Sequence, residues 1–132
     1  MSYASRLSRD PRETYRAVDV ASRTGGANPH QLITILYEDV LRELRLGALA
    51  IDAGDLTGKN ERLTKAVALL FALEAGLDFD KGGSVAEALS RFYRGCRDAV
   101  MRASIEGNAA LVRDVAANVG EIAESWKTIG RG

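Results

Sequence analysis

Four stretches of the chain repeat apolar residues at intervals of three and four positions, the spacing that places side chains on one face of an α-helix. The first stretch follows "ANPHQL", where Asn28 can cap free backbone N–H groups and Pro29 suits the first helical position. The pattern predicts a helix over about residues 29–53. Its core-facing stripe contains Ile33, Leu36, Tyr37, Val40, Leu41, Leu44, Ala48 and Ile51.

Three further helices are expected at about residues 57–77, 84–106 and 109–129. Ser84 and Glu87 form the S-x-x-E pattern of a capping box at the start of the third helix. Short connections between consecutive helices favour antiparallel neighbours. The fold class is therefore predicted to be all-α, an antiparallel up-down four-helix bundle.

The domain organisation follows from the same pattern, with the bundle occupying residues 28–132 and a separate segment occupying residues 1–27. In that segment "PRETYRAVDVAS" offers only about two turns of helical pattern, and "RTGGA" separates it from the first long helix. We expect a mobile N-terminal arm or a short cap helix.

The stretch "LDFDKGG" between the second and third helices could be a metal loop, a phosphate cradle or a turn. A calcium loop starting at Asp78 would need an oxygen ligand at its twelfth position, which is Leu89. The phosphate-loop pattern G-x-x-x-x-G-K-[ST] is absent. We interpret the stretch as a turn in which Gly82 and Gly83 permit the change of direction before a cap at Ser84.

Residues that could support catalysis are scarce. A di-metal carboxylate site in a bundle uses two Glu-x-x-His pairs, but the chain has one histidine, His30, expected at the surface. The single cysteine, Cys96, lies on the inward stripe of the third helix and is expected to act as a small buried apolar residue. We predict no enzyme activity, no cofactor and no metal.

Charge and hydropathy restrict the partners and the compartment. Eighteen basic residues balance 18 acidic ones without a concentrated basic face, which argues against nucleic acid as a partner. The longest apolar run, Ala66 to Leu73, is far shorter than the roughly 20 residues that cross a bilayer. No membrane insertion is predicted, and a lone cysteine fits a reducing, cytoplasmic location.

Several residues are left over once the core stripes are assigned. Interior glycines at 47, 95 and 120 cost roughly 1 kcal/mol each relative to alanine, so each needs a packing reason. Closely packed bundle helices would explain them, and so would an external apolar groove for a partner helix. The candidate partner-binding residues are Ile35, Leu46 and Leu49 on the first helix, opposite its core stripe, and Ala116, Gly120 and Ala123 on the fourth.

The order of four motifs resembles the FliS family of flagellin export chaperones over about residues 13–130. The motifs are "ETYRAVDVAS", "ANPHQLITILYED", "LDFDKGGSVAEALSRFY" and "ESWKTI". The resemblance implies a non-enzymatic helical bundle in the cytoplasm that binds the disordered C-terminal segment of flagellin. It also implies that binding prevents premature polymerisation and keeps the cargo ready for export.

The family resemblance further implies a role for the N-terminal arm, which would cover part of the cargo surface through Tyr15 and Val18. These two residues would then move when cargo arrives, or Tyr15 would be a permanent part of the end of the bundle. Other flagellar export or regulatory proteins are further candidate partners. The alternative is a structural or self-associating bundle, in which the surplus apolar face forms a homodimer without flagellin.

Overall fold

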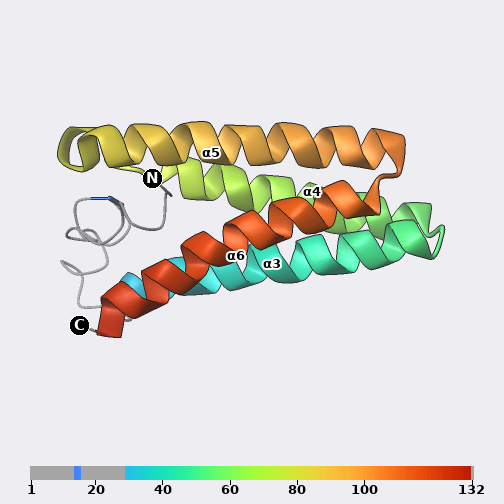
Figure 1. The fold of residues 1–132 in the computed structure, drawn as a ribbon, viewed down its shortest axis with the longest axis horizontal. Coiled ribbons are helices and arrows are strands. Elements are labelled where there is room, and N and C mark those ends of the chain that lie inside the picture. The colour runs from blue at the N-terminus through green and yellow to red at the C-terminus, as the bar shows by residue number, and fades with distance from the viewer. Residues whose placement is uncertain (1–13, 16–28, 132) are drawn as a thin grey trace.

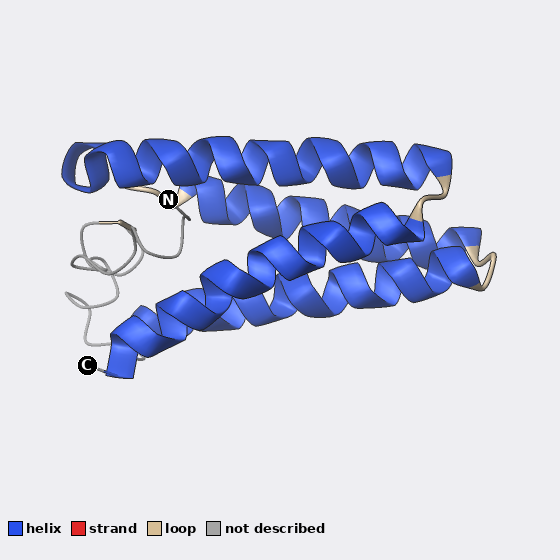
Figure 2. Ribbon diagram, viewed as in Figure 1, coloured by secondary structure: helices blue, strands red, loops and turns tan. Residues whose placement is uncertain are grey.

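The computed structural model describes residues 14–15 and 29–131, and within these ranges the fold is four long helices without a strand. They are α3 (Pro29–Asp52), α4 (Leu56–Ala75), α5 (Phe79–Glu106) and α6 (Ala109–Arg131) (Figure 1). Short loops join them, so that consecutive helices run in opposite directions (Figure 2). The predicted all-α four-helix bundle is confirmed.

The four helices do not pack against each other to the same extent. α3 makes the most extensive contacts, with α4 on one side and α6 on the other, whereas the α5–α6 interface is the smallest of the four between neighbouring helices. Figure 1 shows α5 and α6 separating toward the end of the bundle that holds the start of α3 and the end of α6. We call this end, where Leu77 and Trp126 lie, the open end of the bundle. Apart from Thr14 and Tyr15, the predicted arm and its Val18 lie outside the described residues.

The core follows the periodicity of the sequence. Leu36 and Ile51 on the predicted stripe of α3 are partly buried and pack against the core cluster, and the remaining stripe residues are buried. Cys96 on α5 is buried as expected, and Trp126 on α6 has no exposed surface. Packed apolar side chains from all four helices therefore fill the space between them.

The connection between α4 and α5 is shorter than the sequence suggested. Asp78 is the N-cap of α5, and its side-chain oxygen accepts a hydrogen bond from the backbone N–H of Lys81 at 3.0 Å. α5 therefore begins at Phe79, five residues before the predicted cap at Ser84, although the helix is interrupted at Gly83, directly before that residue. Gly83 departs from helical geometry with φ 50° and ψ −127°, a conformation that glycine adopts without strain. The "KGG" sequence thus forms a kink inside α5, not a separate loop.

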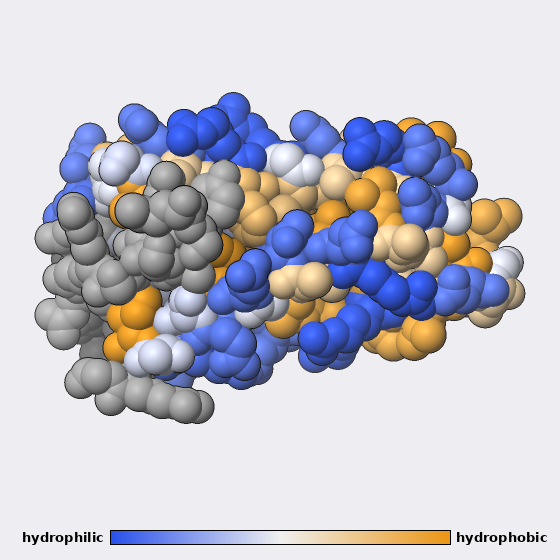
Figure 3. Space-filling model, viewed as in Figure 1, coloured by the Kyte–Doolittle hydropathy of each residue, from blue (hydrophilic) through white to orange (hydrophobic). Residues whose placement is uncertain are grey.

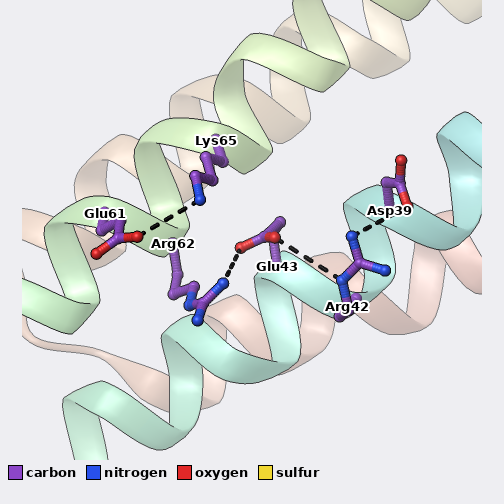
Figure 4. Close-up of polar contacts among 6 residues, drawn as sticks. All are labelled: Asp39, Arg42, Glu43, Glu61, Arg62 and Lys65. Carbon is purple, nitrogen blue, oxygen red and sulfur yellow. Dashed lines mark hydrogen bonds and ion pairs between the residues drawn. The ribbon is translucent and has the colours of Figure 1, made fainter.

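α3 and α4 form a close seam around a glycine. A Cβ atom built on Gly47 would lie 2.4 Å from Cδ2 of the buried Leu63, so only glycine allows the present approach of the helices. Next to it the buried carboxylate of Glu43 lies 3.4 Å from the Arg62 guanidinium of α4 and 3.8 Å from that of Arg42 (Figure 4). A buried charge needs such partners to offset its lost hydration. The close-packing explanation of the interior glycines therefore holds for Gly47.

The other two interior glycines are not explained by close packing. A Cβ atom on Gly95 would meet no atom within 4 Å, and one on Gly120 would meet only Leu41 Cδ2 at 3.9 Å, an ordinary contact. Gly120 has room above it for another group.

Candidate partner-binding surfaces

Tyr15 inserts from the N-terminal segment into the open end of the bundle. Its side chain has no exposed surface, and its ring packs edge-on against Trp126 with centroids 5.7 Å apart and an interplanar angle of 82°. The backbone is held as well, because Asp78 N–H donates to the Thr14 carbonyl at 2.9 Å and Tyr15 forms an isolated antiparallel bridge with Leu77. Tyr15 is thus part of the core in this structure.

Three tyrosine hydroxyls meet inside this end of the bundle. Tyr37 of α3 and Tyr93 of α5 are joined by an O–O distance of 2.7 Å, Tyr15 lies 3.3 Å from Tyr37, and a third hydrogen bond joins Tyr15 to Tyr93. Each hydroxyl can donate one bond and accept another, so a ring of three satisfies all of them. Burial raises the pKa of Tyr37 to about 12 and raises the pKa values of Tyr15 and Tyr93 well above the ordinary tyrosine value.

His30 also belongs to this end, contrary to the expected surface position. Its ring stacks on Trp126 with centroids 4.5 Å apart, and its Nε2 lies 2.5 Å from the Trp126 carbonyl oxygen. Trp126 Nε1–H in turn donates to the His30 carbonyl at 2.9 Å. These reciprocal contacts tie the start of α3 to the end of α6, so His30 has a packing role that its position beside the cap did not reveal.

A groove runs between α3 and α6, and we call it the α3–α6 groove. Its volume is about 490 Å³. Leu49 of α3, which is 58% exposed, faces Ala116 and Gly120 of α6 across it. The complete lining is Arg45, Leu49, Arg113, Ala116, Ala117 and Gly120. The structure therefore brings together three of the candidate residues from two helices.

The remaining candidates lie elsewhere. Ile35 is 50% exposed but is separated from Leu49 by about 21 Å along α3, at 1.5 Å per residue. Leu46 is half-buried, and Ala123 packs in the core. These two helices therefore turn only part of the candidate surface outward: Ile35 and Leu49 are exposed, whereas Ala123 is buried.

A second groove, between α4 and α5, was not predicted. Leu63 and Val67 of α4 and Met101 and Ile105 of α5 are among its lining residues, and its volume is about 310 Å³. Met101 is 54% exposed and Ile105 is 87% exposed. Met101 and Ile105 occur four residues apart and therefore share one face of α5. That face lies off the core stripe, which is the signal that selected Ile35 and Leu49 on α3. Applied to every helix, that signal would have found them.

The chemistry available at these surfaces is apolar contact and hydrogen bonding. Within residues 14–15 and 29–131 no three His, Cys, Asp or Glu side chains gather as a metal site would require. Burial raises the pKa of the Cys96 thiol to about 12, which keeps it protonated at neutral pH. No helix in the described part of the chain is long and apolar enough to cross a membrane. Figure 3 shows polar surface along α5 and α6 with an apolar band between them.

Comparison with known proteins gives this bundle a family. The model of the flagellar protein FliS family matches residues 11–132. The chain belongs to the FliS family. This is a chaperone family and not an enzyme family.

Three FliS relatives match most of the chain. The flagellar secretion chaperone FliS of Salmonella typhimurium is 35% identical over 118 residues, covering 89% of this chain and 87% of the relative. The FliS of Vibrio cholerae is 27% identical over 117 residues, covering 89% and 86%, respectively. The flagellar secretion chaperone FliSB of Pseudomonas aeruginosa is 27% identical over 115 residues, covering 87% and 91%. The match therefore extends over the whole bundle, including α3, α6 and the groove between them.

Proposed function

We propose that this protein is a cytoplasmic export chaperone that binds the disordered C-terminal segment of flagellin. Binding would prevent premature polymerisation and keep flagellin competent for flagellar assembly. The observation that carries the proposal is the α3–α6 groove, where the exposed side chain of Leu49 stands beside the open floor at Gly120. Membership of the FliS family supports flagellar export as the process.

The groove suits a partner that folds as it binds. A disordered segment that becomes helical on a groove loses conformational entropy, so a broad apolar contact gives an affinity that still allows release. Release is necessary for an export chaperone because the cargo must leave before it enters the growing filament. Exposed apolar residues on α3 and in the α4–α5 groove offer additional contact for a long segment.

Calorimetry with the purified protein and the C-terminal flagellin segment of the same organism tests this proposal. Leu49→Asp places a charge in the groove and should abolish most of the binding. Leu56→Asp is the matched control, because Leu56 is 68% exposed and lines neither groove. Both variants should melt cooperatively. A well-folded parent that does not bind the segment would exclude flagellin as the cargo, and light scattering would then test the homodimer.

We also propose that the N-terminal arm acts as a lid, with Tyr15 and Val18 covering part of the cargo surface until cargo displaces them. The complete burial of Tyr15 supports a site that the arm fills in the free protein. Deletion of residues 1–24 tests the lid by calorimetry and thermal melting. A displaceable lid predicts unchanged or tighter binding of the flagellin segment. Weaker binding together with a lower melting temperature would instead make Tyr15 a permanent part of the bundle.

A further inference from the structure

The rim of the α3–α6 groove carries positive charge from both helices. Arg45 of α3 and Arg113 of α6 line the groove, and no carboxylate is among its lining residues. Arg113 is ion-paired with Asp52 near the end of α3, and both side chains are about half exposed. Arg45 is exposed, and the ion pairs among the described residues do not include it. The groove therefore presents two cations beside an apolar floor.

The floor between these arginines admits close approach. Ala116, Ala117 and Gly120 provide small side chains, and the nearest atom to a Cβ on Gly120 would be 3.9 Å away. Leu49 forms an apolar wall on the α3 side. Large apolar side chains of a partner can thus enter the groove while neighbouring positions of the same partner reach the rim.

We propose that the α3–α6 groove selects an amphipathic helical segment whose apolar face is flanked by Asp or Glu. The apolar side chains would lie against Leu49 and Gly120, and the carboxylates would pair with Arg45 and Arg113. Arg45 is the principal recognition residue, because Arg113 must exchange its contact with Asp52 for the new one. This inference rests on the proposed function in that the segment is part of the flagellin cargo.

The arginine side chain suits this role for a geometric reason. A guanidinium group donates two parallel hydrogen bonds to one carboxylate, which fixes direction as well as charge. On a helical partner, carboxylates three or four residues apart lie on one side, so two of them can follow the rim. The pairs are only half-buried, and each therefore adds a modest gain in affinity while strongly disfavouring a basic segment.

Charge reversal tests the inference with the natural cargo. Arg45→Glu should weaken binding of the flagellin segment roughly three- to tenfold, since it replaces attraction by repulsion at a partly exposed site. Arg91→Glu is the matched control because Arg91 is exposed on α5 and lines neither groove. The affinity of this variant for the flagellin segment should stay within about twofold of that of the parent. Exchanging a carboxylate of the segment for arginine should restore binding to the Arg45→Glu variant.

A second measurement separates this inference from the identity of the cargo. Two labelled synthetic amphipathic helices share one leucine face and carry either glutamate or lysine beside it, and fluorescence anisotropy follows their binding to the full chain. The glutamate peptide should bind more tightly than the lysine peptide, and Arg45→Glu should reverse that order. Equal binding of both peptides would overturn the inference. If flagellin fails to bind while the glutamate peptide is still preferred, the proposed cargo is wrong and the recognition chemistry stands.

Discussion

The α3–α4 seam and the open end of the bundle show two different ways of closing a helical core. At the seam, Gly47 lets the backbones approach until Leu63 fills the contact, and the Glu43–Arg62 ion pair lies beside it. At the open end, α5 and α6 diverge, and Tyr15 from outside the four helices occupies the interior. The seam is complete within the helices, whereas the open end depends on an added side chain.

The two regions differ in where the contacting groups come from. A larger residue at Gly47 would overlap the side chain of Leu63, so that side chain or the two helices would have to shift. Tyr15, in contrast, binds the hydroxyls of Tyr37 and Tyr93, which also bind each other. The seam therefore serves as the fixed framework, and the open end is the region in which substitutions should reveal how much the arm contributes.

The largest expected effect comes from removing the aromatic side chain that joins the open end. Trp126→Ala would leave a cavity next to Tyr15 and His30 and should lower the free energy of unfolding by about 3–5 kcal/mol. Urea denaturation followed by circular dichroism measures it. Ile105→Ala, at a side chain that is 87% exposed, is the control and should change stability by less than about 0.5 kcal/mol. Similar losses in both variants would contradict the assignment of Trp126 to the core.

The buried hydroxyls predict a loss of stability in alkali. Because the folded-state pKa of Tyr37 is about 12 and its ordinary value is 10.0, folding favours the protonated hydroxyl. This contribution is fully present below pH 10 and decreases as the pH rises toward 12, by roughly 1.4 kcal/mol per pH unit for each such hydroxyl. Ultraviolet absorbance of tyrosinate should rise together with unfolding. A rise at pH 10 equivalent to more than one of the four tyrosines of the chain, while the helices persist, would show that the buried hydroxyls are accessible.

Tyr15→Phe isolates the hydroxyl from the ring that carries it. The aromatic contact with Trp126 remains, but Tyr37 and Tyr93 lose a partner in the hydroxyl ring. Stability should decrease by about 1–3 kcal/mol, the typical cost of breaking a buried hydrogen bond. Comparing the melting temperatures of Tyr15→Phe and Tyr15→Ala would separate the contribution of the hydroxyl to stability from that of the aromatic ring. An unchanged melting temperature for Tyr15→Phe would mean that water replaces the missing partner.

At the seam, Gly47→Ala should lower stability by about 1 kcal/mol. The new Cβ would overlap Leu63, at a cost of roughly 1–3 kcal/mol, and the better helix propensity of alanine offsets part of it. A double-mutant cycle with Leu63→Ala measures the steric term, because the smaller residue removes the overlap. Gly47→Ala should then be neutral or stabilising in the Leu63→Ala background. Additive effects of the two changes would contradict the close contact.

The smallest expected effect is a gain at a glycine outside the seam. Gly95 is exposed in the middle of α5, and no atom lies within 4 Å of the position that a Cβ would occupy there. Gly95→Ala should therefore stabilise the protein by up to about 1 kcal/mol. Chemical denaturation of both variants tests this. The free energy of unfolding should increase in Gly95→Ala and decrease in Gly47→Ala if packing, and not helix propensity alone, distinguishes the two sites. A loss of stability in Gly95→Ala would imply a contact that the structure does not show.

The sequence predicted the features that depend on local periodicity and could not predict those that depend on distant contacts. The core stripe of α3 was found because a repeat of three and four positions identifies one helical face. Asp78 and Ser84 are both good capping residues, and local pattern alone could not choose between them. The packing of His30 and the burial of Tyr15 depend on Trp126, which lies about 100 positions away in the sequence.

The candidate binding surface shows the same division. Leu49 was selected because it lies opposite the core stripe of α3, and Ala116 and Gly120 were selected because they belong to a strip of small residues on α6. Both are local properties of one helix. That they line one groove depends on the pairing of α3 with α6, and that Ala123 is buried depends on the same packing. Arg45 and Arg113 were overlooked because exposed arginines are common, and only their place on the rim distinguishes them. The binding roles of all these residues stay predictions.

The ring of three hydroxyls has a consequence for the order of folding. Tyr15 meets Tyr93 across 78 positions of sequence, and Tyr37 meets the same hydroxyl across 56. The receiving site for Tyr15 exists only after α3, α5 and α6 have come together, and contacts over such separations form late because loop closure costs entropy. Docking of the Thr14–Tyr15 segment is thus expected to be the last folding step. A chain that folds in this order would complete its helical framework first and close its core with a residue that precedes all four helices in the sequence.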